Sequence, residues 1–475
     1  MNRNLRQVKR LEGSVEIPPS YRTAFRIALP ALFAEGITLI NPFPKCVAGE
    51  SLIHFFQNTF PGALTRSGSA VSIAGYGSFT AEALPSEIDT GNDGMLLMNL
   101  LPLYLRRGGL LSCEKGAVSP KIELLIKQLD KLGFYVESEN AENKFSVKIT
   151  PASPDSVHLP ITSADEVLKT ALLYAMLNVS GNSRIIESTP MPDESENMLR
   201  RMKAAVTSFR KGEMLPDEED AVTESTANDD ELMRRIRKIQ AKKEATSSEK
   251  PTRTIQIGET SKLKAAEFNL AGDPMCAAPF LLAGLLINHS SVTVKSIEGS
   301  ATSGVFAALR RMGAQFNSER VKDKNAFDCL SEPVKLVGRR ISGELAADVG
   351  ELLPFVAVAA AYAEGQTVIR DAGFLRNGER DIISLTLDNL RAMGTKVGEI
   401  EDGFVIEGAR EHDGTEFDAG GVPAIGMAFA VAAMKNKGES VIRGAEAVDA
   451  VFPDFFHRLE SLVKEDKPIS SETIV

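Results

Sequence analysis

Five polar residues could do chemistry because each stands directly before an apolar stretch of helical length: Ser20, Asp93, Asp165, Asp273 and Glu351. The start of a helix exposes backbone N–H groups and the positive end of the helix dipole, and both attract phosphate and carboxylate groups. Helix starts that meet at one place would therefore form an anion-binding site. Each side chain is also suited to capping its own helix. The residues alone leave both interpretations open.

The elements that must position these residues are buried helices. Leu352–Ala363 is almost wholly apolar and alanine-rich, so a helix here must be buried on all sides. Gly365 is expected to end this helix, and Gln366–Arg370 has the β-branched residues of a short strand. Ile382–Met393 then has the spacing of an amphipathic surface helix. This order of elements predicts one compact α/β unit.

The same unit recurs along the chain with a period of about 70 residues, which is longer than that of solenoid repeats. The other buried helices are expected in Arg26–Asn41, Met95–Leu111, Thr170–Glu187, Pro279–Ile297 and Met427–Gly444. Their amphipathic partners are expected in Ser51–Phe60, Lys121–Phe134, Glu194–Val206, Gly304–Ala314 and Phe452–Val463. The pattern predicts six α/β units, and three helix starts in each of two domains would face one another across a cleft.

Composition limits the classes of partner. The chain has 475 residues, which is enough for two or three domains, and 54 Lys and Arg against 64 Asp and Glu give a net charge of −10. That balance argues against a nucleic acid or an anionic membrane surface as the partner. No apolar run reaches the roughly 18 residues of a membrane span, and the basic N-terminus lacks the apolar core of a secretory signal. We expect a cytoplasmic protein without a membrane partner.

Cysteines and histidines give no sign of a metal or redox centre. The cysteines are Cys46, Cys113, Cys276 and Cys329, and the histidines are His54, His158, His289, His412 and His457. Neither set has the close spacing of metal ligands, and the cysteines do not form a disulfide framework. We therefore expect no metal, no cofactor and a reducing compartment.

One segment, at about 209–260, interrupts the repeat. It begins with an acidic low-complexity stretch and continues with a basic one in which Leu232, Ile236 and Ile239 have helical spacing. Such a charged insertion is typical of a solvated excursion from the fold. The alternative is a helix near Leu232–Ile239 that docks on a protein partner. The sequence leaves both interpretations open.

Several strings of residues resemble the enolpyruvyl transferase family, and in particular its EPSP synthase-like members. The strings are GSVEIPPSYRTAFRIALPALFAEG, TGNDGMLLMNLLPL, TALLYAML, AGDPMCAAPFLLA, LPFVAVAAAYAEGQTVIRDAGFLRNGERD and FPDFF. The resemblance implies a two-domain inside-out α/β barrel of six βαβαββ units. It places one domain at 20–271, including the insertion, and the other at 1–19 plus 272–475.

The family reaction moves the enolpyruvyl group of phosphoenolpyruvate onto a hydroxyl of shikimate 3-phosphate in a closed interdomain cleft. The resemblance implies that Glu351 and Glu379 are the catalytic carboxylates, with Glu351 in place of the family's aspartate. The substrate-binding residues that it implies are Ser20, Arg22, Arg26, Asn92 and Asp381. The expected ligand is a small molecule held between the domains.

The chain departs from the family where the family places cations. Uncharged residues replace them at Tyr21, Met98, Gly378, Ile382, Ala424 and Ala450. The family's phosphate-holding S-S-Q motif reads Asp165-Glu166-Val167 here. A carboxylate about 4 Å from a phosphate repels it by roughly 4 kcal/mol per pair of unit charges at an effective dielectric constant near 20. We therefore expect the family reaction to be inefficient in this protein.

Three functions remain open from the sequence. The first is the family reaction, run with rearranged groups such as Arg22 and Arg26. The second is a diverged enzyme that acts on a less anionic cyclic substrate, with Glu351 and Glu379 as acid and base. The third is a non-catalytic binding or scaffolding paralogue that uses the insertion near Leu232–Ile239 to dock on a partner.

Overall fold

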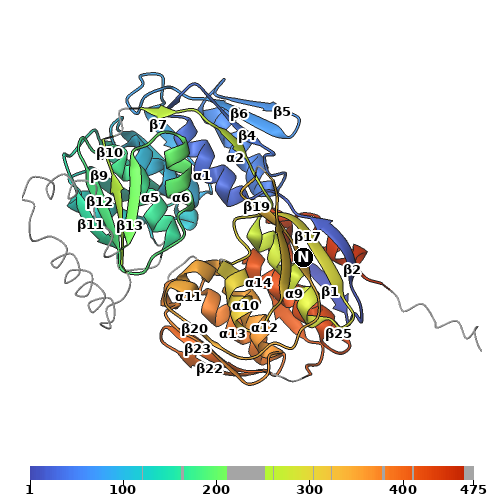
Figure 1. Cartoon of the computed structure of the whole chain (residues 1–475). Coiled ribbons are helices and arrows are strands. Elements are labelled where there is room, and N and C mark those ends of the chain that lie inside the picture. The colour runs from blue at the N-terminus through green and yellow to red at the C-terminus, as the bar shows by residue number, and fades with distance from the viewer. Residues whose placement is uncertain are drawn as a thin grey trace, which may run out of the picture.

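The computed structural model describes residues 1–119, 121–161, 165–210, 252–259, 262–302, 304–322, 324–376, 380–408 and 411–464. Figure 1 shows two lobes, one blue to green and the other yellow to red with the blue N-terminus. One hydrophobic core draws its residues from Ala24 to Leu270. The other combines Leu5, Leu11 and Val15 with residues from Met275 to Leu462. These cores support 20–271 and 1–19 plus 272–475 as proposed domain boundaries.

The upper domain contains three units. The first has helices α1 (Tyr21–Ala31) and α2 (Val47–Thr59) with strands β4 (Ile37–Asn41), β5 (Leu64–Ser67), β6 (Ala70–Ala74) and β16 (Glu267–Asn269). The second has α3 (Gly94–Leu100) and α4 (Ile122–Lys131) with β7 (Glu87–Asp89), β8 (Gly109–Glu114), β9 (Tyr135–Asn140) and β10 (Lys144–Thr150). The third has α5 (Glu166–Met176) and α6 (Glu194–Arg201) with β11 (His158–Ile161), β12 (Ser183–Glu187), β13 (Val206–Arg210) and β14 (Arg253–Ile257). A short pair, β3 (Ala34–Glu35) and β15 (Leu263–Lys264), lies beside them.

The lower domain repeats the plan. The fourth unit has α9 (Pro274–Leu286) and α10 (Gly304–Arg311) with β2 (Glu12–Glu16), β17 (Ser291–Glu298), β18 (Phe316–Arg320) and β19 (Ala326–Ser331). The fifth has α11 (Glu344–Val349), α12 (Leu353–Ala361) and α13 (Ile382–Ala392) with β20 (Arg340–Ile341), β21 (Gln366–Ile369), β22 (Lys396–Ile400) and β23 (Gly403–Glu407). The sixth has α14 (Pro423–Lys435), α15 (Glu446–Val451) and α16 (Phe455–Ser461) with β1 (Asn2–Arg6), β24 (Glu416–Asp418) and β25 (Glu439–Arg443).

Within the described residues, five of the six units share one four-stranded order, and the sixth has three strands. In the second unit β7 pairs parallel with β8, β8 antiparallel with β10, and β10 antiparallel with β9. The same order holds in the third unit and in the fifth. The predicted two-domain α/β fold of six repeated units is confirmed.

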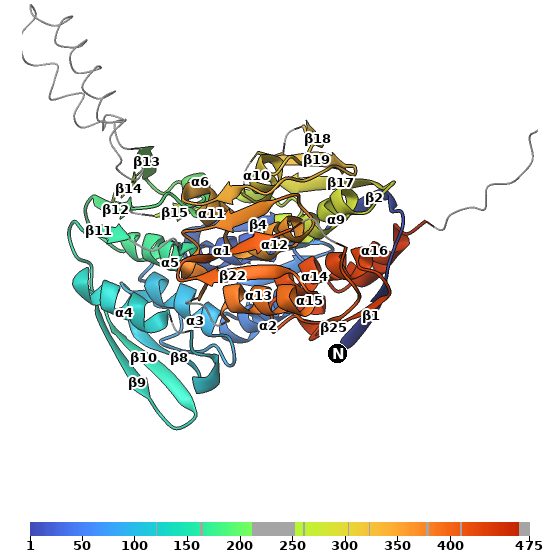
Figure 2. The same ribbon diagram turned by 90° about the horizontal axis from the view of Figure 1, so that it is seen from below.

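The chain crosses between the domains at two adjacent places. The backbone N–H of Ser20 donates to the carbonyl of Ala271 at 3.3 Å, and the N–H of Asp273 donates to the carbonyl of Pro18 at 2.9 Å. The helix α2 of the upper domain also lies against α15 of the lower domain (Figure 2). The starts of α1 and α9 are therefore held close to the domain junction.

Two expectations need correction. Helix α12 ends at Ala361, before Gly365, and Gly365 instead forms the turn into β21 with a φ of +84°. The ends of the expected insertion at 209–260 belong to the fold, because β14 pairs with β12 and β13 in the third sheet. The alternating side chains of residues 254–257 favour this strand despite the charged flank. The expected docking helix near Leu232–Ile239 lies outside the described residues.

Other expectations concern the surface and the cysteines. All four cysteines are buried and free. Within the described part of the chain, no helix has the length and apolar character needed to cross a membrane. The described residues also contain no group of three or more His, Cys, Asp or Glu side chains that could hold a metal ion.

A buried ionic cluster holds the third unit together. Lys169 Nζ lies 2.8 Å from Glu196 Oε1 and 3.2 Å from Glu187 Oε1. Arg253 Nε lies 2.6 Å from Glu187 Oε2, and its Nη2 lies 2.9 Å from Glu196 Oε1. Lys169 and both glutamates are fully buried, and the charges balance. The cluster ties α5, β12, α6 and β14 together at the strands that flank the insertion.

We expect Lys169→Met to lower the free energy of unfolding by about 3–5 kcal/mol, because two buried carboxylates would lose a cation. Urea denaturation followed by far-ultraviolet circular dichroism measures this. The matched control is Lys127→Met on the exposed face of α4, which should change stability by less than about 0.5 kcal/mol. Equal stabilities of the two variants would contradict the role assigned to the cluster.

Candidate functional site

The two arginines of α1 face the domain junction. Arg22 and Arg26 are four residues apart, so they lie on the same side of the helix. Arg22 forms an ion pair with Glu351, which belongs to the turn of 3₁₀-helix before α12 in the lower domain. The Arg22 guanidinium holds the pKa of Glu351 below its usual range. Glu351 is therefore an ionised carboxylate that joins the two domains.

Arg26 is bound on both sides by carboxylates of its own domain. Its Nη2 lies 2.5 Å from Glu166 Oε1, and its Nη1 lies 2.6 Å from Glu194 Oε2. The Arg26 side chain is only 12% exposed, so it needs partners of opposite charge. These partners occupy both terminal nitrogens of the guanidinium. Arg26 is consequently neutralised before any ligand arrives.

Lys121 is a further cation near this junction, and sequence reasoning missed it. Its Nζ lies 2.9 Å from Asp165 Oδ2 at the start of α5. Asp165 Oδ1 also caps α5, accepting from the N–H groups of Val167 and Leu168 at 3.1 Å each. In the sequence, Lys121 is only a basic residue just before α4, and such a residue does not by itself indicate a site. This third cation is also paired within the chain.

Glu298 is a second residue that the sequence did not single out. It ends β17, and its Oε2 accepts a hydrogen bond from Thr23 Oγ1 at 3.1 Å. Burial raises the pKa of Glu298 to about 8, with further contributions from the charges of Glu194 and Asp273. Glu298 is therefore largely protonated at neutral pH, whereas Glu351 is ionised. Each of these two carboxyl groups binds a residue of α1, and their protonation states are opposite.

The capping interpretation explains most of the polar residues before the helices. Asp93 Oδ1 accepts from the N–H of Leu96 at 2.8 Å, and Asp273 Oδ1 accepts from the N–H of Met275 at 2.8 Å. Glu351 differs from them, because the start of α12 has no side-chain cap and the carboxylate binds Arg22 instead.

The other predicted site residues have different surroundings. Ser20 is buried and caps α1, accepting from the N–H of Thr23 at 3.3 Å. Asp381 caps α13 and pairs with Arg376 at 3.1 Å. Asn92 is exposed in the turn before α3. Glu379 lies outside the described residues.

The charge balance at this junction is acidic. Among the described residues near α1, the cations are Arg22, Arg26 and Lys121, and each forms an ion pair with the chain's own carboxylates. The carboxyl groups are Asp165, Glu166, Glu194, Asp273, Glu298, Asp348 and Glu351. Arg380 is exposed beside Gly421, at the start of α14, and forms no ion pair within the described residues. A ligand therefore meets more negative than positive charge near α1.

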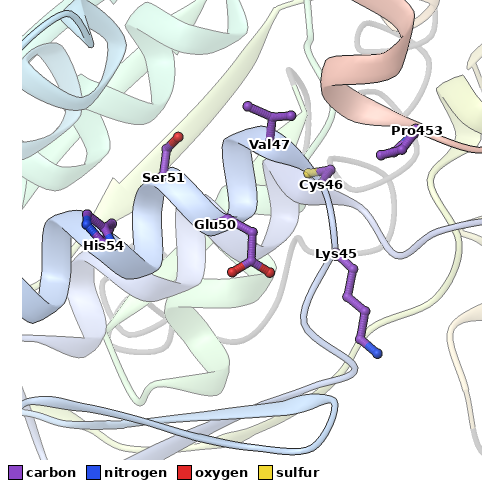
Figure 3. Close-up of a pocket in the computed structure, with 7 residues that line it drawn as sticks. All are labelled: Lys45, Cys46, Val47, Glu50, Ser51, His54 and Pro453. Atoms are coloured by element: carbon purple, nitrogen blue, oxygen red, sulfur yellow. The ribbon is translucent and has the colours of Figure 1, made fainter.

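A shallow crevice of about 590 Å³ lies at another part of the domain junction (Figure 3). It runs along the start of α2 and faces Pro453 of the lower domain. The Cys46 thiol on its edge caps α2, and burial raises the pKa of this thiol. A thiol with a raised pKa is a poor nucleophile at neutral pH. The crevice does not include Arg22 or Glu351.

Known proteins share this architecture. The structure superposes on EPSP synthase from Acinetobacter baumannii with a TM-score of 0.74 at 21% identity, covering 97% of this chain and 98% of the other. The enolpyruvyl transferase NikO from Streptomyces tendae gives a TM-score of 0.65 at 16% identity, covering 97% and 96%. At these identities the two structures show the fold alone.

Sequence comparison extends the similarity. A 3-phosphoshikimate 1-carboxyvinyltransferase of Bacillus cereus (strain G9842) is 25% identical over 461 residues, which is 96% of this chain and 97% of the relative. The corresponding protein of Bacillus thuringiensis subsp. konkukian is 26% identical over 463 residues, with the same coverage. The family model described as EPSP synthase (3-phosphoshikimate 1-carboxyvinyltransferase) matches residues 5–218 and 214–459. The chain therefore belongs to the EPSP synthase family.

Proposed function

We propose that this protein is a diverged member of its family that binds a small, weakly charged cyclic ligand between its domains and acts on it by acid–base chemistry. In this proposal enolpyruvyl transfer to 3-phosphoshikimate is inefficient or lost. The observation that carries it is the pairing of Arg22, Arg26 and Lys121 with carboxylates of the same chain. These cations are the ones that phosphate groups would need.

Electrostatics oppose an anionic substrate here. A phosphate that reaches Arg26 must displace Glu166 or Glu194, which then remain near it as repelling charges. Each such pair at about 4 Å costs roughly 4 kcal/mol at an effective dielectric constant near 20. Two such pairs would cancel roughly 8 kcal/mol, the binding free energy of a micromolar ligand. The site therefore favours a ligand with little negative charge.

The carboxyl groups supply the acid and the base. Glu298 is protonated at neutral pH and can donate a proton, while Glu351 is ionised and can accept one. A pair of carboxyl groups with separated pKa values is a common arrangement for elimination or isomerisation. In this proposal Arg22 orients Glu351, and Thr23 orients Glu298. Glu379 remains a proposed catalytic residue, and Ser20, Arg26, Asn92 and Asp381 remain proposed contributors to the ligand site.

Two other functions keep specific support. The family reaction is supported by similarity over 96% of the chain to a 3-phosphoshikimate 1-carboxyvinyltransferase. It is also supported by Arg380 beside Gly421, which has no ion pair among the residues that the structure describes. A non-catalytic binding or scaffolding role is supported by ion pairs that satisfy the site without a ligand. The three functions differ in the ligand charge that they require and in turnover.

A series of ligands with one ring and decreasing negative charge tests the proposal. The series is 3-phosphoshikimate, shikimate and methyl shikimate, each examined by the shift in melting temperature. We expect the phosphorylated compound to give the smallest shift, because it meets the carboxylates near α1. We also expect no phosphate release from 3-phosphoshikimate with phosphoenolpyruvate. Phosphate release above background, or the reverse order of shifts, would support the family reaction instead.

The double substitution Glu166→Gln with Glu194→Gln should create an anion site. Arg26 would keep hydrogen-bonding partners but lose the charges that neutralise it. We expect inorganic phosphate to bind at least about tenfold more tightly, which corresponds to about 1.4 kcal/mol. Isothermal titration calorimetry measures this, with Glu137→Gln plus Glu139→Gln on exposed β9 as the control of equal charge. No gain over that control would show that other residues exclude anions.

The raised pKa of Glu298 predicts a pH dependence of stability. Because this pKa is about 8 in the folded protein and 4.5 in the reference state, the ionised form disfavours folding as pH rises through this range. Glu298→Gln removes that loss. The free energy of unfolding of the variant minus that of the wild type should therefore increase by roughly 3–4 kcal/mol from pH 5 to pH 8. Urea denaturation at both values measures the gain, and exposed Glu139→Gln should show none.

A further inference from the structure

A pocket of about 720 Å³ lies in the lower domain, where the buried helices α9, α12 and α14 end. These three helices pack side by side in the yellow-to-red lobe (Figure 1). Leu286 is the last residue of α9, Tyr362 follows the last residue of α12, and Lys435 is the last residue of α14, and all three line the pocket. The pocket is thus built by the C-terminal ends of the central helices.

This pocket is separate from the interdomain site. Glu351 precedes α12 and Tyr362 follows it, so the whole helix lies between them. Its nine residues correspond to about 13 Å at 1.5 Å per residue. A ligand in the pocket cannot contact Arg22 or Arg26 on the far side of that helix.

One wall of the pocket is apolar. It is made by Leu285, Leu286, Val334 and Leu336, which line the pocket together with Pro333. Contact with these branched side chains would bury apolar surface of a ligand, and this burial stabilises binding by about 25 cal/mol per Å². The pocket therefore has the mixed lining that is usual for small-molecule sites, with an apolar wall and a few polar groups.

Lys435 has no ion-pair partner within the described residues, and Glu411 is the carboxylate whose charge acts on it. Two other lysines in the lining are paired, Lys335 with Glu364 at 2.6 Å and Lys437 with Glu411. In the described part of the chain, no carboxylate lies within 4 Å of Lys435 Nζ. Burial lowers the pKa of Lys435, so a nearby anion would stabilise its charged form. A single positive charge with two carboxylates nearby suits a singly charged anion better than a phosphate.

The polar end of the pocket is fixed in position. The Tyr362 hydroxyl donates to Asn436 Oδ1 at 2.5 Å, and its ring packs edge-on against His412 at 5.2 Å. Asn436 is buried, and its Nδ2 has no hydrogen-bond acceptor within the described residues. Asn436 does not line the pocket itself; its hydrogen bond fixes the hydroxyl of Tyr362, which does line it.

We propose that this pocket is a second ligand site, which binds a small organic monocarboxylate. Its carboxylate pairs with Lys435, and its apolar body lies against Leu286, Val334 and Leu336. The site does not depend on the function assigned to the interdomain junction.

The test uses 4-phenylbutyrate as the probe and isothermal titration calorimetry on the full chain. We expect binding by the wild type and at least about tenfold weaker binding of the neutral 4-phenylbutan-1-ol, because the alcohol lacks the charge for Lys435. Lys435→Met should weaken phenylbutyrate binding by a similar factor, and Lys435→Arg should retain it. Lys127→Met on α4 is the matched control and should bind like the wild type.

Two further variants locate the probe. Leu336→Trp fills the apolar wall and should abolish binding, whereas Glu351→Gln alters the interdomain junction and should leave binding unchanged. Melting temperatures of all variants confirm that they are folded. The proposal is wrong if phenylbutyrate fails to bind at millimolar concentration. It is also wrong if Lys435→Met binds as the wild type does, or if Glu351→Gln rather than Lys435→Met weakens binding.

Discussion

The neutralisation of two arginines on α1 is the constraint on which the rest of the junction depends. Arg26 is almost buried, and a buried guanidinium is tolerated only with carboxylates beside it. Glu166 and Glu194 meet that requirement from the third unit of the same domain. Arg22 is more exposed, at 43%, and pairs with Glu351 across the junction. Charges that could hold a ligand therefore serve to join helices and domains.

This arrangement changes what the scaffold can do chemically. Helix starts favour anions, but the acidic cap of α5 and the carboxylates paired with Arg22 and Arg26 oppose them. The junction therefore has an excess of carboxyl groups, and the surroundings of each group decide whether it is protonated. Glu351 stays ionised beside Arg22, whereas Glu298 is held protonated by burial. Under the proposed function, proton transfer is favoured where anion binding is disfavoured.

The lower domain also shows that the two ends of a central helix can have different chemistry. The start of α12 carries an ionised glutamate in an ion pair. Its end lies beside an apolar wall and Lys435, which has no ion pair in the described part of the chain. Helix C-termini favour cations through their dipole, which explains why lysines gather at this end. Short, fully buried helices such as α12 place both environments within one rigid element.

The sequence by itself determined the repeat, the buried helices and the residues that cap them, because periodicity and capping are local properties that neighbouring residues set. Ser20, Asp93, Asp165 and Asp273 could be identified in this way. Tertiary structure decided the ion pairs of Arg22 and Lys121, the buried cluster around Lys169 and the protonation of Glu298. Arg22 and Glu351 are 329 positions apart, and no local pattern encodes their contact. Packing between distant parts of the chain brings such charges together, and neighbouring charges and burial then set the pKa values of Glu351 and Glu298.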